Sequence, residues 1–282
     1  MKRLALLVSE DPGDLAAFSG EDHLLAEALK SRGWAARPIP WPRAGAVAAD
    51  FDAALIRGTW DYHLRRAEFL DTLSELRCPV WNPSPLARWN SDKRYLESLA
   101  AAGVPVVPTL FETGLPDLET ARRHFGVSAL VCKPAVGASA YLTFLVGPHQ
   151  DAGPARAALA GKACLVQPYL EEIAREGEAS LIYFGERFSH AVRKRPAAGD
   201  FRVQEELGGR SAPMQPSTAE LDLGAQALAA LPTPPLYARV DMVKLRGRPV
   251  VMEIELIEPV LYLAKAPGSA DRFARAIASV LE

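Results

Sequence analysis

Three acidic residues near the end of the chain have the types and spacing that suit a metal ion. Glu253 and Glu255 lie two residues apart in "VMEIELIEP" (residues 251–259), so in a β-strand both side chains project from one face. Asp241 lies in "ARVDMV", which we expect to form the facing strand of a hairpin. Three carboxylates on one face repel each other unless a cation lies between them, and hard oxygen ligands suit Mg2+ or Mn2+. A solvated sheet face, screened by basic neighbours such as Arg239, is the alternative.

Two lysines in costly positions predict a phosphate-binding region. Lys133 lies in the apolar stretch "ALVCKPAVGASA", where a cation needs an anionic partner. Small residues follow it, and their backbone N–H groups could approach phosphate oxygens, although the P-loop pattern is absent: Gly137, Ala138, Ser139 and Ala140. Lys93 lies near the start of an expected helix, where the helix dipole disfavours an unpartnered cation. An amine that reaches solvent is the alternative for both lysines.

The segment "QPYLEEIAREGE" follows an apolar strand and has groups that suit a nucleoside. Gln167, Tyr169 and Leu170 could offer backbone N–H and C=O groups to a purine edge. The carboxylate of Glu178 could accept hydrogen bonds from ribose hydroxyls. A charged surface loop is the alternative.

Two arginines are candidates for binding a carboxylate or a phosphate, because the guanidinium group is planar and donates bidentate hydrogen bonds. Arg57 follows a buried strand, at the end where parallel sheets bind ligands. Arg193 lies in "HAVRKRP", on a strand whose residues alternate between two faces. Each could instead be a solvated residue, and His190 in the same strand is expected to pack rather than to act as an acid or base.

The elements that would position these residues change character along the chain. Residues 1–89 alternate strands and helices, which predicts an α/β domain with a small parallel sheet. A helix is expected over residues 90–103, capped by Asn90 or Ser91, followed by strands interrupted by the small-residue loop. From Glu176 onward the pattern predicts antiparallel hairpins and two helices, and hence an α+β region.

Composition limits the classes of partner. The chain has 282 residues, of which 49% are hydrophobic, enough for two or three packed subdomains. The net charge of −2 and the lack of a long basic run argue against a nucleic-acid partner. No apolar stretch reaches the roughly 18–20 residues of a membrane span. The N-terminal apolar core is only "LALLV", so we interpret it as a strand rather than a signal peptide and expect a cytoplasmic protein.

The order of these features resembles the ATP-grasp superfamily from about Trp89 to the end of the chain. The preceding residues are similar to the domain before the grasp in bacterial glutathione synthetases, through "IRGTWDYH" and "NPSPLARWNSDK". The stretches "RGTWDY", "WNSDKRYL", "HAVRKRP" and "ELIEP" are similar to the group containing the O-ureidoserine cyclo-ligase of cycloserine biosynthesis. The resemblance implies an α/β N-terminal domain (1–89) followed by an α+β ATP-grasp fold, whose central (90–170) and C-terminal (171–282) subdomains clasp ATP.

The resemblance also implies roles for individual residues. Lys93 and Lys133 match lysines that contact the ATP phosphates, and residues 137–140 match the loop that covers them. Residues 167–170 match the adenine-binding hinge, and Glu178 matches the ribose-binding acid. Three further groups match the metal ligands, the arginine near the transferred phosphate, and a residue that faces the substrate, respectively: Asp241, Glu253 and Glu255; Arg193; and Arg57.

The implied activity is an ATP-dependent carboxylate–amine ligase that acts on a small amino-acid-like substrate through an acylphosphate. Ring closure within one molecule is a variant of the same reaction, and a non-catalytic nucleotide-binding regulator is the alternative. Dimers are common in such families, which leaves a homodimer open. The chain departs from the pattern at Glu255, where many members have Asn, at Val260, where a polar residue is usual, and in a phosphate loop with one glycine.

Overall fold

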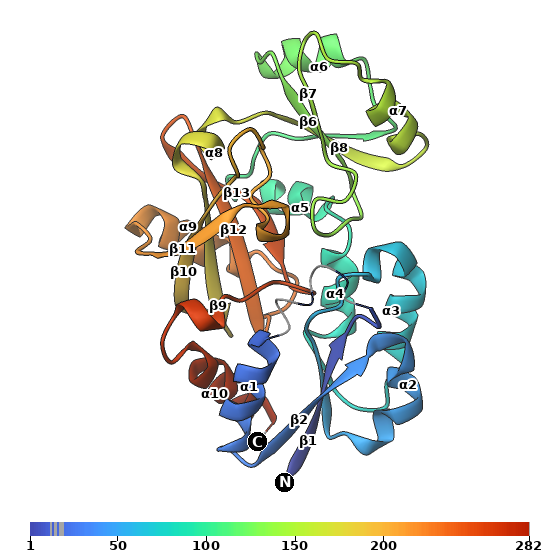
Figure 1. Ribbon diagram of the computed structural model, residues 1–282, viewed down its shortest axis with the longest axis vertical. Helices are drawn as coiled ribbons and strands as arrows, with labels where there is room; N and C mark the ends of the chain where they lie inside the picture. Colours follow the sequence, from blue (N-terminus) through green and yellow to red (C-terminus); the bar gives the residue numbers. More distant parts are fainter. Residues whose placement is uncertain (12, 14–15, 17–19, 282) are drawn as a thin grey trace.

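The computed structural model describes residues 1–11, 13, 16 and 20–281, and three sheets organise this part of the chain (Figure 1). The N-terminal sheet is parallel, with strand order β2-β1-β3-β4. Residues 4–7 of its central strand are all buried, as expected for a parallel sheet covered on both faces. The elements of this region are β1 (Lys2–Val8), α1 (Gly20–Lys30), β2 (Trp34–Pro40), α2 (Ala44–Val47), β3 (Ala53–Ile56), α3 (Arg66–Glu75), β4 (Val80–Trp81) and α4 (Ser84–Asn90).

The second sheet is a small antiparallel layer with strand order β5-β8-β6-β7. Its core is built from Leu130, Cys132 and Val166 on the strands and from Ala155 and Leu159 on a covering helix. In Figure 1 this layer, drawn in green, stands apart from the other two sheets. Its elements are β5 (Leu110–Thr113), α6 (Leu118–Phe125), β6 (Leu130–Pro134), β7 (Phe144–Val146), α7 (Gly153–Leu159) and β8 (Ala163–Pro168). The preceding helix α5 (Tyr95–Ala101) packs instead in the core of the third sheet.

The third sheet is antiparallel, with strand order β11-β10-β9-β12-β13. Both expected hairpins are present, and the second pairs Asp241 with Glu253 and Arg239 with Glu255 across the strands. The elements are α8 (Glu171–Glu176), β9 (Glu178–Phe184), β10 (Arg187–Arg195), β11 (Arg210–Met214), α9 (Thr218–Ala229), β12 (Tyr237–Leu245), β13 (Arg248–Glu255) and α10 (Ser269–Leu281). The prediction of an α/β region followed by an α+β region is confirmed.

The first and third sheets share one hydrophobic core. Leu4 and Leu55 of the N-terminal sheet pack in the same cluster as Ile182 of β9 and Phe273 of α10. Helices α1 and α10 lie side by side in Figure 1. Each sheet lies within one of the three expected segments, and the exact boundaries between segments stay a prediction. Along the described chain, no helix combines the length and the apolar character that crossing a bilayer requires.

The helix expected over residues 90–103 begins later than predicted. Helix α4 ends at Asn90, and α5 begins at Tyr95, so the intervening residues form a turn. Asn90 does not cap a helix. Its side chain donates to the Ile254 carbonyl (2.8 Å) and accepts from the Leu256 N–H (3.0 Å). Tertiary hydrogen bonds to β13 therefore replace the local capping that the sequence indicated.

Candidate active site

A cavity lined by residues from all three regions of the chain brings together most of the residues singled out in the sequence. Trp60, from the loop after β3, lines it on the N-terminal side, and the segments around Lys133 and Gln167 line it on the central side. The candidate nucleotide- and metal-binding residues that line it are Lys93, Lys133, Gly137, Ala138, Ser139, Gln167, Tyr169, Leu170, Glu178, Asp241, Glu253 and Glu255. Arg57 and Arg193 are not among the described residues that line it.

The two candidate phosphate-binding lysines converge on one carboxylate. The Nζ atom of Lys93 lies 3.2 Å from Glu253 Oε1, and that of Lys133 lies 3.7 Å from Glu253 Oε2. Burial opposes the charge on both lysines, and it lowers the pKa of Lys133, whereas Glu253 raises the pKa of Lys93. Lys93 also donates to the Gly137 carbonyl at 2.8 Å, which ties the small-residue loop to the turn before α5.

The small-residue loop adopts a backbone that L-residues rarely use. Ser139 and Ala140 have φ angles of 48° and 55°, in the left-handed region. Tyr141, which follows them, places its ring 4.7 Å from the His63 ring of the N-terminal region, measured between centroids. The loop therefore reaches across the cavity from the central sheet to the N-terminal region.

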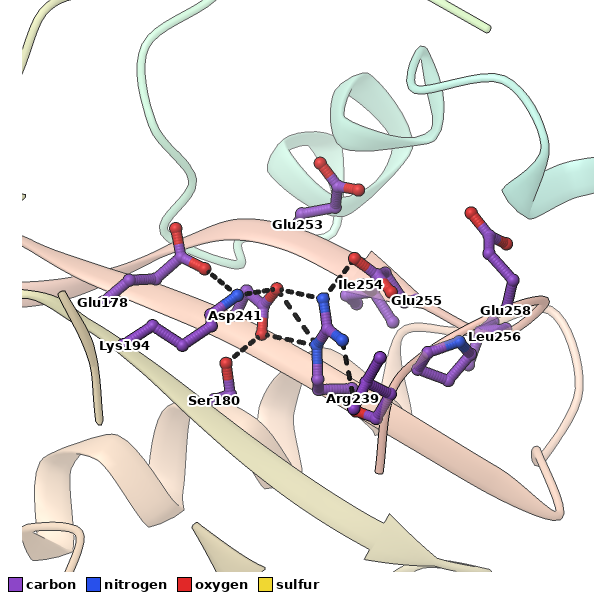
Figure 2. A network of polar contacts seen from close by, with 12 residues as sticks. Glu178, Ser180, Lys194, Arg239, Asp241, Glu253, Ile254, Glu255, Leu256 and Glu258 are labelled. Atoms are coloured by element: carbon purple, nitrogen blue, oxygen red, sulfur yellow. Dashed lines mark hydrogen bonds and ion pairs between the residues drawn. The ribbon is translucent and has the colours of Figure 1, made fainter. Parts of the chain in front are cut away.

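Asp241 lies at the centre of a buried charge network (Figure 2). Its carboxylate accepts from Arg239 Nη2 and Lys194 Nζ, each at 2.9 Å, and from Ser180 Oγ at 2.6 Å. Although burial opposes ionisation, Arg239 and Lys194 lower the pKa of Asp241. Lys194 also pairs with Glu178, whose pKa burial raises.

Glu255 lies at the other side of Arg239 and pairs with it. Burial raises the pKa of Glu255 to about 7, and the attraction of Arg239 only partly offsets this. Cross-strand pairing explains the arrangement, because Arg239 faces Glu255 and Asp241 faces Glu253 in adjacent positions of the hairpin. The strands therefore alternate acidic and basic groups on the cavity face.

This pattern bears on the expected metal centre. Among the described residues, no group of three acidic, histidine or cysteine side chains lies close enough to hold an ion, because basic side chains stand between the acids. The donor chemistry nevertheless suits Mg2+, since the three acids supply hard oxygen ligands from facing strands, and Mg2+ in nucleotide sites needs only one or two carboxylates beside phosphate oxygens. The assignment of Asp241, Glu253 and Glu255 to a metal stays a prediction.

The basic residue of β10 that lines the cavity is Lys194, one position after the expected Arg193. Arg193 turns away from the cavity and pairs with Glu220 of α9 at 3.3 Å. Lys194, the next residue, lines the cavity and is 4% exposed. Successive side chains of a strand point to opposite faces, so Lys194 rather than Arg193 points into the cavity.

Arg57 is buried away from the cavity, contrary to the prediction that it faces a substrate. Its guanidinium group lies 2.9 Å from Asp22 and 3.6 Å from Glu21, both on α1. It also donates to the Pro259 carbonyl at 3.3 Å. Arg57 thus joins the N-terminal region to the chain that follows β13.

Arg239 was missed as a functional candidate. It was considered only as a screening charge, although it lies two residues before Asp241 and must share its face of the strand. Glu258, which the sequence places beyond the strand as a substrate-side or structural residue rather than a metal ligand, also lines the cavity. His190 lies outside the described lining: its Nε2–H donates to the Leu261 carbonyl at 2.8 Å, and burial lowers its pKa to about 4.

The architecture and the site define a class of protein. The fold matches the structure of a D-alanine–D-alanine ligase from Bacillus anthracis complexed with ATP, with a TM-score of 0.75 and 18% identity over 100% of this chain and 96% of that one. A closer match is the crystal structure of D-cycloserine synthetase DcsG, with a TM-score of 0.86 and 30% identity over 99% and 100% of the two chains. The protein is an ATP-grasp ligase that forms C–N bonds.

Sequence comparison places it within that class. Residues 4–82 match the family model described as "D-cycloserine synthetase DcsG, N-terminal domain". The chain is also 34% identical to the cycloserine biosynthesis protein DcsG of Streptomyces lavendulae, over 92% of this chain and 93% of that protein. The chain belongs to the DcsG family, which confirms the resemblance seen in the sequence.

Proposed function

We propose that this ligase phosphorylates the carboxylate of a small amino-acid-like substrate with ATP and then joins the acyl group to a nitrogen nucleophile. In the first step a carboxylate oxygen attacks the γ-phosphorus of ATP, and ADP leaves. In the second, the nitrogen attacks the acyl carbon of the acylphosphate, inorganic phosphate leaves, and the nitrogen loses a proton. The observation that carries the proposal is that one cavity gathers basic and acidic residues from separate segments of the chain: Lys93, Lys133, Lys194, Arg239, Asp241, Glu253 and Glu255.

The basic residues would supply charge stabilisation rather than covalent chemistry. Phosphoryl transfer depends on positioning and on neutralising the charge of the phosphoryl oxygens. Lys93 and Lys133 would bind ATP phosphates, and Lys194 and Arg239 would face the transferred group, taking the role expected of Arg193. Residues 137–140 would cover the phosphates and exclude water from the acylphosphate. Residues 167–170 would hold the adenine and Glu178 the ribose.

Asp241, Glu253 and Glu255 would hold Mg2+, which offsets phosphate charge when it is bound. The observed ion pairs are consistent with this role. Glu253 pairs with both candidate phosphate-binding lysines, so a magnesium–phosphate group would offer a cation to the acid and an anion to the lysines. The buried charges would exchange partners rather than lose them, which avoids the cost of an unpaired buried ion.

Ring closure within one molecule is the form of the reaction that we favour. The relatives named as cycloserine proteins cover nearly the whole chain, and the product of such an enzyme is a ring. The substrate would then carry both the carboxylate and the nucleophilic nitrogen.

An ADP-release assay on a panel of compounds tests the proposal. The panel contains the common amino acids in both configurations and O-ureidoserine, each alone and in pairs, with and without Mg2+. We expect Mg2+-dependent ADP release with a single compound and, by mass spectrometry, a product one water lighter than the substrate or a further breakdown product of that ring. Release that requires two compounds would indicate intermolecular ligation instead. Absence of release with every compound, although ATP binds, would contradict the proposed function.

A further inference from the structure

The chain that follows β13 is anchored through its backbone by the N-terminal region and by β12. We refer to residues 258–262 as the 258–262 loop. Four successive residues are bonded: the carbonyl groups of Glu258, Pro259 and Val260 accept from Trp60 (3.1 Å), Arg57 (3.3 Å) and Arg239 (3.2 Å), and the Leu261 N–H donates to Glu21 (2.8 Å). The donors come from the N-terminal region and from β12, so the position of the loop is fixed by both.

The side chain of Glu258 is held in place by this loop but is itself unpartnered. It lines the cavity, and among the described residues its carboxylate has neither a hydrogen bond nor an ion pair. Figure 2 shows it apart from the dashed network, on the far side of Glu255 from Glu178. A fixed backbone that presents a free carboxylate to a cavity is an arrangement that suits ligand recognition, because the protein has already met the cost of positioning it.

The basic groups nearest to Glu258 are already engaged. Lys93 and Arg239 act on it electrostatically, but Lys93 pairs with Glu253, and Arg239 pairs with Glu255 and Asp241. Burial raises the pKa of Glu258 well above its usual value, and Glu255 raises it further. A cation delivered by a ligand would offset this burial penalty and stabilise the ionised carboxylate, and an ammonium group is the cation that an amino-acid-like substrate carries.

We propose that Glu258 binds the ammonium group of the substrate and selects compounds that carry one. The inference rests on the proposed function and deepens it. In Figure 2, Glu178 and Glu258 lie at opposite ends of this group of cavity residues, with Arg239 and Glu255 between them, and the backbone carbonyl of Glu258 accepts from Trp60. A substrate whose carboxylate meets the transferred phosphoryl group near Arg239 would place its ammonium group against Glu258.

One other cavity carboxylate lacks a partner among the described residues. Glu206 lies in the short helical turn η5 (Glu205–Leu207), on the connection between β10 and β11. Among the described hydrogen bonds, none ties the backbone of Glu206 to the N-terminal region or β12, whereas both regions hold the 258–262 loop, so we assign recognition to Glu258. The Glu206→Gln variant is a comparison within the same cavity that removes a charge of the same type.

Steady-state ADP release in wild type and Glu258→Gln, on the panel above and on matched acids without the amino group, tests the inference. The matched pairs include alanine with propionate and serine with 3-hydroxypropionate. For the compound with the highest wild-type turnover, we expect KM to rise about 10- to 100-fold in Glu258→Gln, the range typical for a lost hydrogen bond to a charged group. KM for ATP should stay within about twofold. Wild type should turn over the amino compound and reject its deamino partner, and Glu258→Asp should recover part of the loss.

Separate outcomes overturn the inference and the proposed function. An unchanged KM in Glu258→Gln, beside normal wild-type turnover, overturns the role of Glu258 alone, as does a rise in KM in Glu206→Gln instead. ADP release by wild type with none of the compounds overturns the proposed function. Glu186→Gln, in the exposed turn between β9 and β10, controls for charge removal far from the cavity. Glu258→Gln should unfold at the wild-type temperature or above it, because no internal partner is lost. A large drop in that temperature would indicate a structural role and overturn the inference.

Discussion

Arg57 and Arg239 are buried to nearly the same degree and have similar surroundings, yet only Arg239 lines the cavity. They are 4% and 7% exposed, and each pairs with two acids. Each also donates to a carbonyl of the 258–262 loop and lies near an aromatic ring. Arg57 and its acids are enclosed between α1 and the C-terminal core, whereas Arg239 and its acids line the cavity.

The comparison shows that burial and ion pairing do not identify a functional arginine. The acids around Arg57 are committed to structural bonds: Glu21, for example, also accepts from the backbone of Leu261 and Leu263. Glu255, the partner of Arg239, instead faces the cavity with a raised pKa. The access of the acidic partners to the cavity is what separates the two clusters.

Replacement of Arg239 should give the largest effect. In Arg239→Met we expect kcat/KM for ADP release to fall about 10^3-fold or more, because the charge that we propose to face the transferred phosphoryl group is lost. Asp241 and Glu255 also lose a partner, so the unfolding temperature should fall. The measurement is steady-state ADP release at a temperature where circular dichroism shows the variant to be folded. Near-normal turnover in the folded variant would contradict the assignment.

Replacement of Arg57 should act on stability instead. Arg57→Met leaves Glu21 and Asp22 without their buried cation, which costs about 3–5 kcal/mol of the free energy of unfolding. Denaturant titration should show this loss, while the folded fraction keeps KM for ATP within about twofold. If kcat/KM of folded Arg57→Met fell as far as that of Arg239→Met, the distinction between the two clusters would be lost.

Much of this arrangement was predictable because it follows local periodicity. The hairpin of β12 and β13, the shared face of Glu253 and Glu255, and the costly Lys133 all follow from spacing and polarity. What could not be predicted depends on contacts across long sequence separations. The partner of Arg57 lies 35 residues away, and its bond to Pro259 spans 202 residues. The face on which Arg193 lies depends on the register of β10, which a run of three basic residues does not specify.

His190 provides a smaller, pH-dependent test of how the 258–262 loop is held. Burial keeps the His190 pKa at about 4 in the folded state, below its usual 6.5, so the unfolded state binds the proton more readily. This group stabilises the fold fully above about pH 6.5. The contribution decreases toward pH 4, by at most about 1.4 kcal/mol per pH unit.

His190→Gln removes that titration and can keep a donor for the Leu261 carbonyl. Unfolding free energies of both proteins between pH 7 and 4 should therefore diverge, with wild type losing more stability as the pH falls. Comparison of the two is necessary because Glu255, whose pKa is raised, acts in the opposite direction over much of this range. Parallel curves would show that His190 does not titrate as its burial requires.

The smallest effect should come from Arg193, and it sharpens the comparison at the level of neighbouring residues. Its partner Glu220 also accepts from the backbone N–H and hydroxyl of Ser217 in the capping box of α9, so it keeps two bonds when Arg193 is removed. Because the pair is largely buried but Arg193 remains partly exposed, Arg193→Ala should cost about 1–2 kcal/mol of unfolding free energy, less than Arg57→Met, and leave ADP release unchanged. Lys194→Met, one residue further, removes a cavity cation from both Asp241 and Glu178, and its turnover should fall by at least an order of magnitude. If Arg193→Ala were instead the inactive variant of the pair, the orientation of β10 would be wrong, and with it the placement of Lys194 beside the transferred phosphoryl group.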